Sequence, residues 1–135
     1  MKAAVSMLLG LLSALFVLAG ASAQTVDGKT VFAKNCAACH QAGGTGIAGA
    51  FPALKGNAFV QAEAEAVIAT VLKGRAGMPT FATALDDDKL AAVLSYVRTA
   101  WGNHGAPISA AEVKAVRDSS RAGEAVKQEQ PTNVH

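Results

Sequence analysis

The stretch "CAACH" at residues 36–40 holds the only two cysteines of this 135-residue chain, and a histidine directly follows the second. Cysteines at this spacing can form a disulfide, a redox-active dithiol, part of a zinc site or two covalent anchors for a prosthetic group. Each possibility makes a different demand on the rest of the chain. The surrounding sequence therefore decides what the motif does.

The first 23 residues have the pattern of a secretory signal peptide. Lys2 supplies a positive charge, an uncharged apolar run follows over residues 3–20, and the small residues "ASA" stand at 21–23. We expect cleavage after this pattern and a mature chain from Gln24. The run is just long enough to span a membrane, so a membrane-anchored form is the alternative. No charged stop-transfer cluster follows the run.

The composition describes a small, nearly neutral protein. The chain carries 12 Lys and Arg residues against 10 Asp and Glu residues, a formal charge of +2, and no basic stripe. We therefore do not expect a nucleic acid partner. One Trp, one Tyr and five Phe are few large side chains for a core. Small domains of this kind often need a covalent staple or a cofactor.

The sequence predicts an all-α protein with glycine-rich loops. Apolar residues recur at helical spacing and no strand-like alternation occurs. The predicted helices cover residues 27–39, 58–73, 86–101 and 109–120, and loops rich in glycine and proline cover 41–57 and 74–85. We assign 24–108 to the main domain and 109–135 to a C-terminal helix with a flexible tail that frays from about residue 123.

Polar residues mark the expected helix ends. Asp27 and Asn57 are predicted N-caps, Gly74 is a predicted C-cap, and Ser109 with Glu112 has the pattern of a capping box. The buried face of the 86–101 helix is predicted to contain Leu90, Val93, Leu94, Val97 and Trp101.

Three interpretations of the cysteine pair each fail on one point. A disulfide suits an exported protein, but a bridge between Cys36 and Cys39 would close a very small loop and add little constraint. A thioredoxin-like dithiol calls for a βαβ unit, and no strand is predicted. Zinc needs four ligands, and only the distant His104 and His135 could add to the motif.

Covalent attachment of haem c explains both cysteines and the histidine together. The thiols of Cys36 and Cys39 would each bond one vinyl group of the macrocycle, and their spacing suits that distance. His40 would then lie under the iron as an axial ligand. The motif therefore predicts one covalent haem c.

Over residues 27–103 the chain resembles a class I c-type cytochrome. Gly28 and Phe32 precede the motif at the spacing of that family, and "LSYVRTAW" at 94–101 resembles its C-terminal helix. The resemblance implies a small cytochrome c fold, with helices wrapped around one haem. It also implies that the first helix crosses the helix of Tyr96, with the glycine allowing close approach.

Met78 is the expected axial ligand opposite His40. It is the only methionine after the signal segment, and it lies in "GMPTF" at 77–81, on a loop between two predicted helices. A methionine that only fills the core is more usual on a helix face. Class I cytochromes carry Met-Pro at this place. His104 remains an alternative donor, although its Gly-rich surroundings predict a solvated turn.

Other haem contacts are predicted from the same two loops. The resemblance implies that the carbonyl of Pro52 accepts the second N–H of the His40 ring. The candidates to wall the haem are Ile47, Phe51, Leu54 and Phe81. Lys73 and Arg75 are candidates to pair with the propionates, but solvated charges at a helix end are the interpretation that we favour.

His/Met ligation would leave no open iron position for a substrate, and thioether ligation favours ferrous iron. No acid, base or nucleophile is arranged for catalysis, so we expect a periplasmic one-electron carrier rather than an enzyme. "YVRTAWGN" at 96–103 resembles haem domains of cytochrome subunits of periplasmic dehydrogenases, which suggests a dehydrogenase donor and an acceptor such as a terminal oxidase. A membrane would be met only through partner complexes.

Two further alternatives stay open from the sequence. The protein could be a tightly held haem subunit of an oxidoreductase complex, which co-purification would reveal. It could instead bind a gas or peroxide, which would require Met78 to leave the iron, and carbon monoxide binding to the reduced form would reveal that.

Overall fold

The computed structural model describes residues 25–129, so the predicted signal segment lies outside it. These residues contain helices and loops and no strand, as predicted, with isolated bridges at Ile47–Phe51 and Arg75–Met78. The elements in chain order are α1 (Gly28–Asn35), α2 (Ala37–His40), α3 (Ala58–Gln61), α4 (Ala64–Lys73), α5 (Asp87–Thr99), a 3₁₀ turn (Ala100–Gly102) and α6 (Ala110–Glu129). No helix in this part of the chain is long and apolar enough to cross a membrane.

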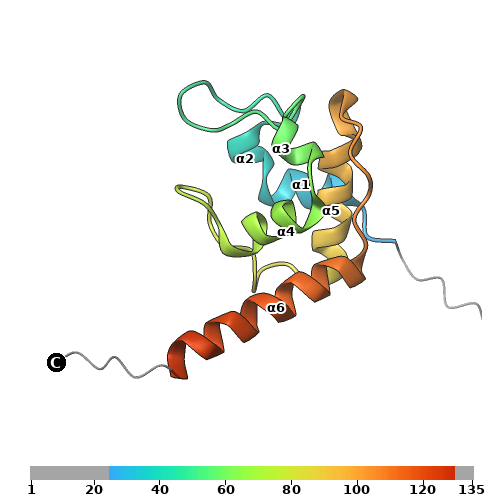
Figure 1. Ribbon diagram of the computed structural model, residues 1–135. Helices are drawn as coiled ribbons and strands as arrows, with labels where there is room; N and C mark the ends of the chain where they lie inside the picture. The colour runs from blue at the N-terminus through green and yellow to red at the C-terminus, as the bar shows by residue number, and fades with distance from the viewer. Residues whose placement is uncertain (1–24, 130–135) are drawn as a thin grey trace, which may run out of the picture.

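The crossing of α1 and α5 forms the centre of the fold (Figure 1). A Cβ atom at Gly28 would lie 2.1 Å from the carbonyl oxygen of Ala92, so a larger residue there would force the helices apart. The Phe32 ring lies 5.6 Å from the Tyr96 ring and 5.2 Å from the Trp101 ring, measured between centroids. This confirms the predicted crossing and its aromatic packing.

The hydrophobic core collects side chains from both ends of the described chain. Its buried members include Val31, Phe32, Val60, Val67, Ile68, Leu72, Leu85, Leu90, Val93, Leu94, Val97, Ile108 and Val113. The last of these lies on α6, which packs against α4 and α5 along one edge of the molecule (Figure 1). The first half of α6 thus shares one core with the helices before it.

Two predicted helices are interrupted. The 27–39 helix breaks at Cys36, which has φ −123° and ends α1 before α2 begins. The 58–73 helix breaks between α3 and α4. There the Arg98 guanidinium donates to the carbonyls of Val60 and Ala62 at 2.8 and 2.9 Å. A side chain from α5 therefore binds the carbonyls at this break, which local periodicity does not reveal.

The predicted fraying from residue 123 is wrong as far as residue 129, because α6 continues to Glu129. The capping box confirms the start of this helix, since Glu112 accepts from the Ser109 backbone N–H at 2.7 Å. After Gly123 the sequence is rich in good helix formers, and one glycine costs a helix only about 1 kcal/mol. Residues 130–135 lie outside the described residues.

Candidate functional site

The two cysteines and the histidine of the motif lie on and next to α2. Cys36 is the residue before this short helix, and Cys39 and His40 belong to its single turn. No disulfide joins the two cysteines, and both side chains are partly buried. Burial, with a smaller effect from the Cys39 thiol, raises the pKa of the Cys36 thiol to about 11. A reactive dithiol needs a lowered thiol pKa, so this environment argues against the redox-dithiol interpretation.

The His40 ring is held in one orientation. It is 9% exposed, and its Nδ1 lies 2.9 Å from the Pro52 carbonyl oxygen. Because a carbonyl can only accept, Nδ1 carries the proton and Nε2 carries the lone pair. Every buried side-chain nitrogen within residues 25–129 has a hydrogen-bond partner. No hydrogen bond to Nε2 occurs among these residues, so Nε2 is not fully enclosed by protein atoms. A neutral imidazole in this tautomer can bind a metal through its Nε2 lone pair.

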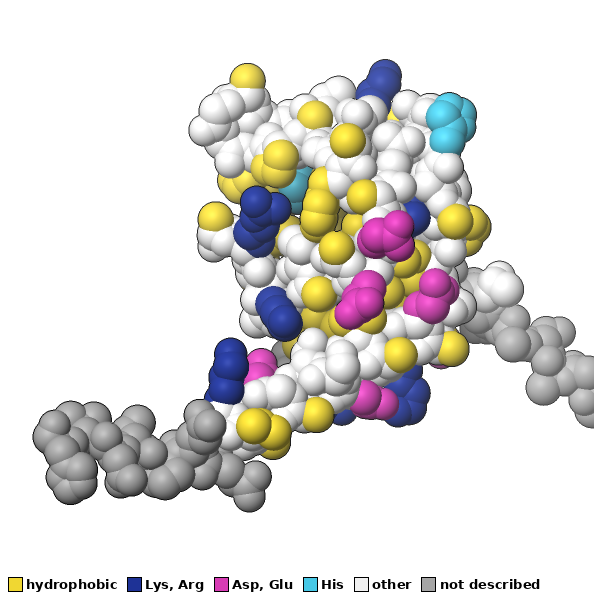
Figure 2. Space-filling model, in the orientation of Figure 1, with side chains coloured by type: hydrophobic (Ala, Val, Ile, Leu, Met, Phe, Trp, Pro, Cys, Tyr) yellow, Lys and Arg dark blue, Asp and Glu magenta, His cyan; other side chains and the backbone are white. Residues whose placement is uncertain are grey.

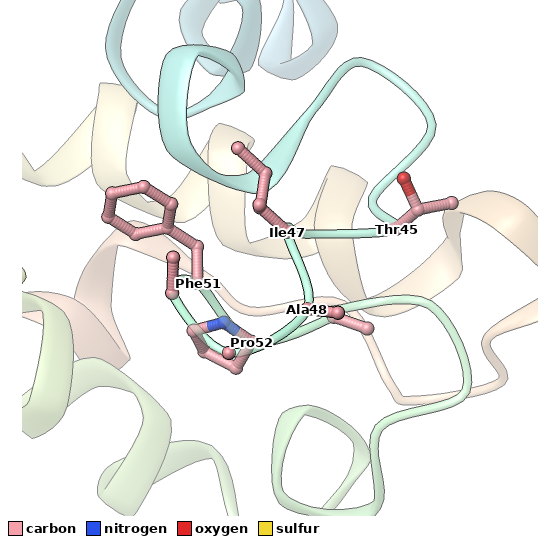
Figure 3. Close-up of a pocket in the computed structure, with 8 residues that line it drawn as sticks. Thr45, Ile47, Ala48, Phe51 and Pro52 are labelled. Carbon is pink, nitrogen blue, oxygen red and sulfur yellow. The ribbon is translucent and has the colours of Figure 1, made fainter.

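The loop over residues 41–57 returns Pro52 to His40 by a tight reversal. The Gly46 N–H donates to the His40 carbonyl at 2.9 Å, and Ile47 bridges Phe51. Gly46 has φ +64°, and a Cβ atom there would lie 2.4 Å from the Phe51 carbonyl oxygen. Only glycine suits this position. Figure 3 shows the Ile47, Phe51 and Pro52 side chains on this loop. They are among the residues that line an open hollow of about 470 Å³.

Asn103 ties this loop to the end of α5. Its Nδ2 donates to the Leu54 and Val97 carbonyls at 3.0 and 2.8 Å, and its Oδ1 accepts from the Gly56 N–H at 2.8 Å. The side chain is 3% exposed. Sequence reasoning missed this residue. The available signal was an asparagine directly after the helix-ending "AWG", but its partners 47 and 49 residues away could not be read from that.

The loop that carries Met78 folds back on the end of α4. Arg75 and Met78 exchange two backbone hydrogen bonds of 3.1 and 2.9 Å, and the Phe81 N–H donates to the Val71 carbonyl at 3.1 Å. Gly74, the confirmed C-cap, has φ +75°. A Cβ atom there would lie 2.6 Å from the Met78 carbonyl oxygen. The methionine lies on a loop between α4 and α5, as predicted, and it is half-buried there.

The two loops project on the same side of the molecule (Figure 1). Figure 2 shows hydrophobic side chains gathered in this region, with a histidine recessed among them. Leu54 and Phe81 are half-buried and pack against the core, whereas Ile47 is 43% exposed. Their contact with haem stays a prediction, as does that of Phe51.

The other predicted candidates lie at the surface. Lys73 and Arg75 are exposed and form no salt bridge within the described residues. His104 is also exposed, and its backbone N–H donates to the Gln61 side chain at 2.8 Å. This is the solvated turn that the sequence predicted for His104.

Known proteins resemble this chain over most of its length. Residues 23–97 match the family model described as cytochrome c oxidase, cbb3-type, subunit III. Cytochrome c-552 of Thermus thermophilus is 37% identical over 127 residues, which cover 78% of this chain and 84% of that protein. The chain belongs to the cytochrome c family. Membership confirms the predicted fold and, with the Cys-x-x-Cys-His spacing, the predicted haem c.

This cytochrome c is also similar to two other kinds of cytochrome. Cytochrome c6 of Leptolyngbya boryana is 42% identical over 78 residues, covering 56% of this chain and 91% of that protein. The cytochrome c subunit of the quinone alcohol dehydrogenase of Gluconacetobacter polyoxogenes is 30% identical over 116 residues, covering 76% of this chain. This cytochrome c spans only 25% of that subunit's length. All of these relatives are electron-transport proteins or subunits.

Proposed function

We propose that this cytochrome c is a periplasmic one-electron carrier, with haem c bonded to Cys36 and Cys39 and the iron bound by His40 and Met78. The observation that carries the proposal is the His40 ring. Its Nδ1–H is engaged by the Pro52 carbonyl, which leaves the Nε2 lone pair as the available donor for the iron. A hydrogen bond of this kind fixes the tautomer of a ligating imidazole and raises its basicity.

Different residues would attach the cofactor, orient its histidine ligand and set the redox preference of its iron. The bound group would supply an iron that accepts and releases one electron. Cys36 and Cys39 would fix it covalently beside α2, and Pro52 would orient the His40 ring. The half-buried Met78 thioether would hold the iron together with His40 and favour the ferrous state. With two ligands supplied by the chain, the iron would have no position for a substrate, and electron transfer would need no proton donor or acceptor.

The cellular setting follows from the N-terminal pattern and the relatives. A cleaved signal peptide over residues 1–23 would place the mature protein in the periplasm. The named alcohol dehydrogenase subunit supports a dehydrogenase as donor, and the oxidase description of the family model supports a terminal oxidase as acceptor. The same two findings are also compatible with one alternative function, that of a haem-bearing subunit held within an oxidoreductase complex. Stoichiometric co-purification with a dehydrogenase or an oxidase would establish that alternative.

The test has two stages. Intact mass of the exported protein should equal the chain from Gln24 plus one haem, with neither cysteine open to alkylation. The oxidised protein should show a sulfur-to-iron charge-transfer band, which Met78→Ala should abolish. That variant should also bind carbon monoxide when reduced, because a coordination position is then open.

His104→Ala is the matched control, because it removes the alternative donor from the surface. It should keep the band and refuse carbon monoxide. A Met78→Ala protein that behaves in the same way would overturn the assignment of Met78. A free thiol pair or a disulfide in the mature protein would overturn the haem site itself.

A further inference from the structure

Arg117 on α6 is a buried cation that is not among the residues proposed to hold the haem. The residue is 8% exposed. Its Nε donates to Asp87 Oδ1 at 2.7 Å, its Nη2 donates to the Leu85 carbonyl at 2.9 Å, and its Nη1 donates to the Ala82 carbonyl. One guanidinium thus binds three successive points on the chain that leads into α5.

These acceptors belong to the segment that begins at Met78. Three residues separate Met78 from Ala82, and they are already tied to α4 by the Phe81 N–H and the Thr80 hydroxyl. The segment is therefore anchored to α4 on one side and to α6 on the other. Arg117 supplies all three hydrogen bonds recorded from α6 to this segment.

We propose that Arg117 is a positioning residue for the Met78 ligand, so that α6 acts as a brace that keeps the Met78 loop closed on the haem. This inference rests on the proposed His/Met ligation. The family match ends at residue 97, so the brace comes from a helix outside the matched residues. A rigid guanidinium fork suits the task because it can bind several acceptors at once in a fixed geometry.

Loss of the brace should let the Met78 loop open more often without unfolding the protein. Local segments open with their own free energies, which are smaller than the free energy of global unfolding. Loss of even one hydrogen bond from a charged donor is enough to shift such an equilibrium by about tenfold. A competing ligand of the ferric iron then binds more tightly in proportion to the open fraction.

Imidazole is the probe, titrated into the oxidised holoprotein while the sulfur-to-iron charge-transfer band is followed. Arg117→Ala should bind imidazole at least about tenfold more tightly than the parent. Arg98→Ala is the matched control, because Arg98 is the other buried arginine of the described residues. It binds the Val60, Ala62 and Ala106 carbonyls, away from the Met78 loop. The imidazole affinity of this control should stay within about twofold of the parent value, although the substitution also lowers global stability.

Two outcomes would overturn the brace. One is an unchanged imidazole affinity in Arg117→Ala, and the other is an equal rise in Arg98→Ala, which would show general loosening. If Arg117→Ala yields no holoprotein, Arg117→Lys takes its place, because it keeps the charge beside Asp87 but lacks the planar fork that places three separate nitrogens against the three acceptors. Its affinity should still rise, and an unchanged value would also overturn the proposal. Failure of the ligation itself is seen separately, as a charge-transfer band that survives Met78→Ala.

Discussion

Replacing Asn103 by aspartate tests how strongly the loop after the haem motif depends on one side chain. Asn103→Asp preserves the shape and the acceptor oxygen for the Gly56 N–H. It removes the Nδ2 donor, which serves the Leu54 and Val97 carbonyls at 3.0 and 2.8 Å. It also brings a carboxylate oxygen against those two carbonyl oxygens.

The expected loss follows from these contacts. Each lost hydrogen bond contributes about 1 kcal/mol to stability. A carboxylate that replaces a side chain only 3% exposed adds a desolvation cost of at least about 1 kcal/mol. Together they should lower the free energy of unfolding by about 3 kcal/mol, which for a domain of this size lowers Tm by roughly 10–20 °C.

The loss should also depend on pH. Burial and the facing carbonyls raise the pKa of the introduced carboxyl in the folded state, so the folded protein binds more protons than the unfolded one. Stability of the variant should therefore fall as pH rises above about 4. In acid the protonated carboxyl can donate one hydrogen bond again, and the deficit should shrink.

The assay is guanidinium unfolding of the holoprotein, followed by circular dichroism at pH 7 and at lower pH. Asn57→Asp is the matched control, because Asn57 caps α3 through an acceptor oxygen that aspartate retains. The one donor bond that this control loses, from Asn57 Nδ2 to the Ala53 carbonyl, is exposed to solvent. That control should stay within about 0.5 kcal/mol of the parent. Equal stabilities for Asn103→Asp and Asn57→Asp would refute the reasoning, and a deficit independent of pH would refute its electrostatic part.

Two further substitutions test the helix crossing and a helix cap. Gly28→Ala should cost about 1–3 kcal/mol, because its methyl would lie 2.1 Å from the Ala92 carbonyl oxygen, and an unchanged guanidinium midpoint would contradict this. Asp86→Ala removes the N-cap of α5, whose carboxylate accepts from the Lys89 N–H at 2.8 Å, and should cost about 1 kcal/mol at neutral pH. Hydrogen bonds from the Lys89 side chain and backbone lower the pKa of Asp86. Thermal melts of parent and variant should therefore converge as pH falls below the usual value of 3.8, because the contribution of a depressed carboxyl is lost on protonation.

Local signals in the sequence predicted much of the fold because they act over a few residues. Asp27 and Asn57 cap the helices where expected, since a capping side chain binds backbone N–H groups two or three positions ahead. The Pro52 acceptor and the exposed His104 turn were also placed correctly. Pro52 followed from family resemblance, because no local pattern links it to a ring 12 residues earlier.

The sequence by itself determined the motif chemistry and the helical periodicity, and family resemblance added the glycine at the crossing of α1 and α5. Only the tertiary structure decided where Arg98, Asn103 and Arg117 act, because each binds backbone carbonyls at least 30 residues away or in a separate element. Carbonyls carry no residue identity, so no sequence pattern marks them as acceptors. Their partners become defined only when packing of α5 and α6 removes the competing water.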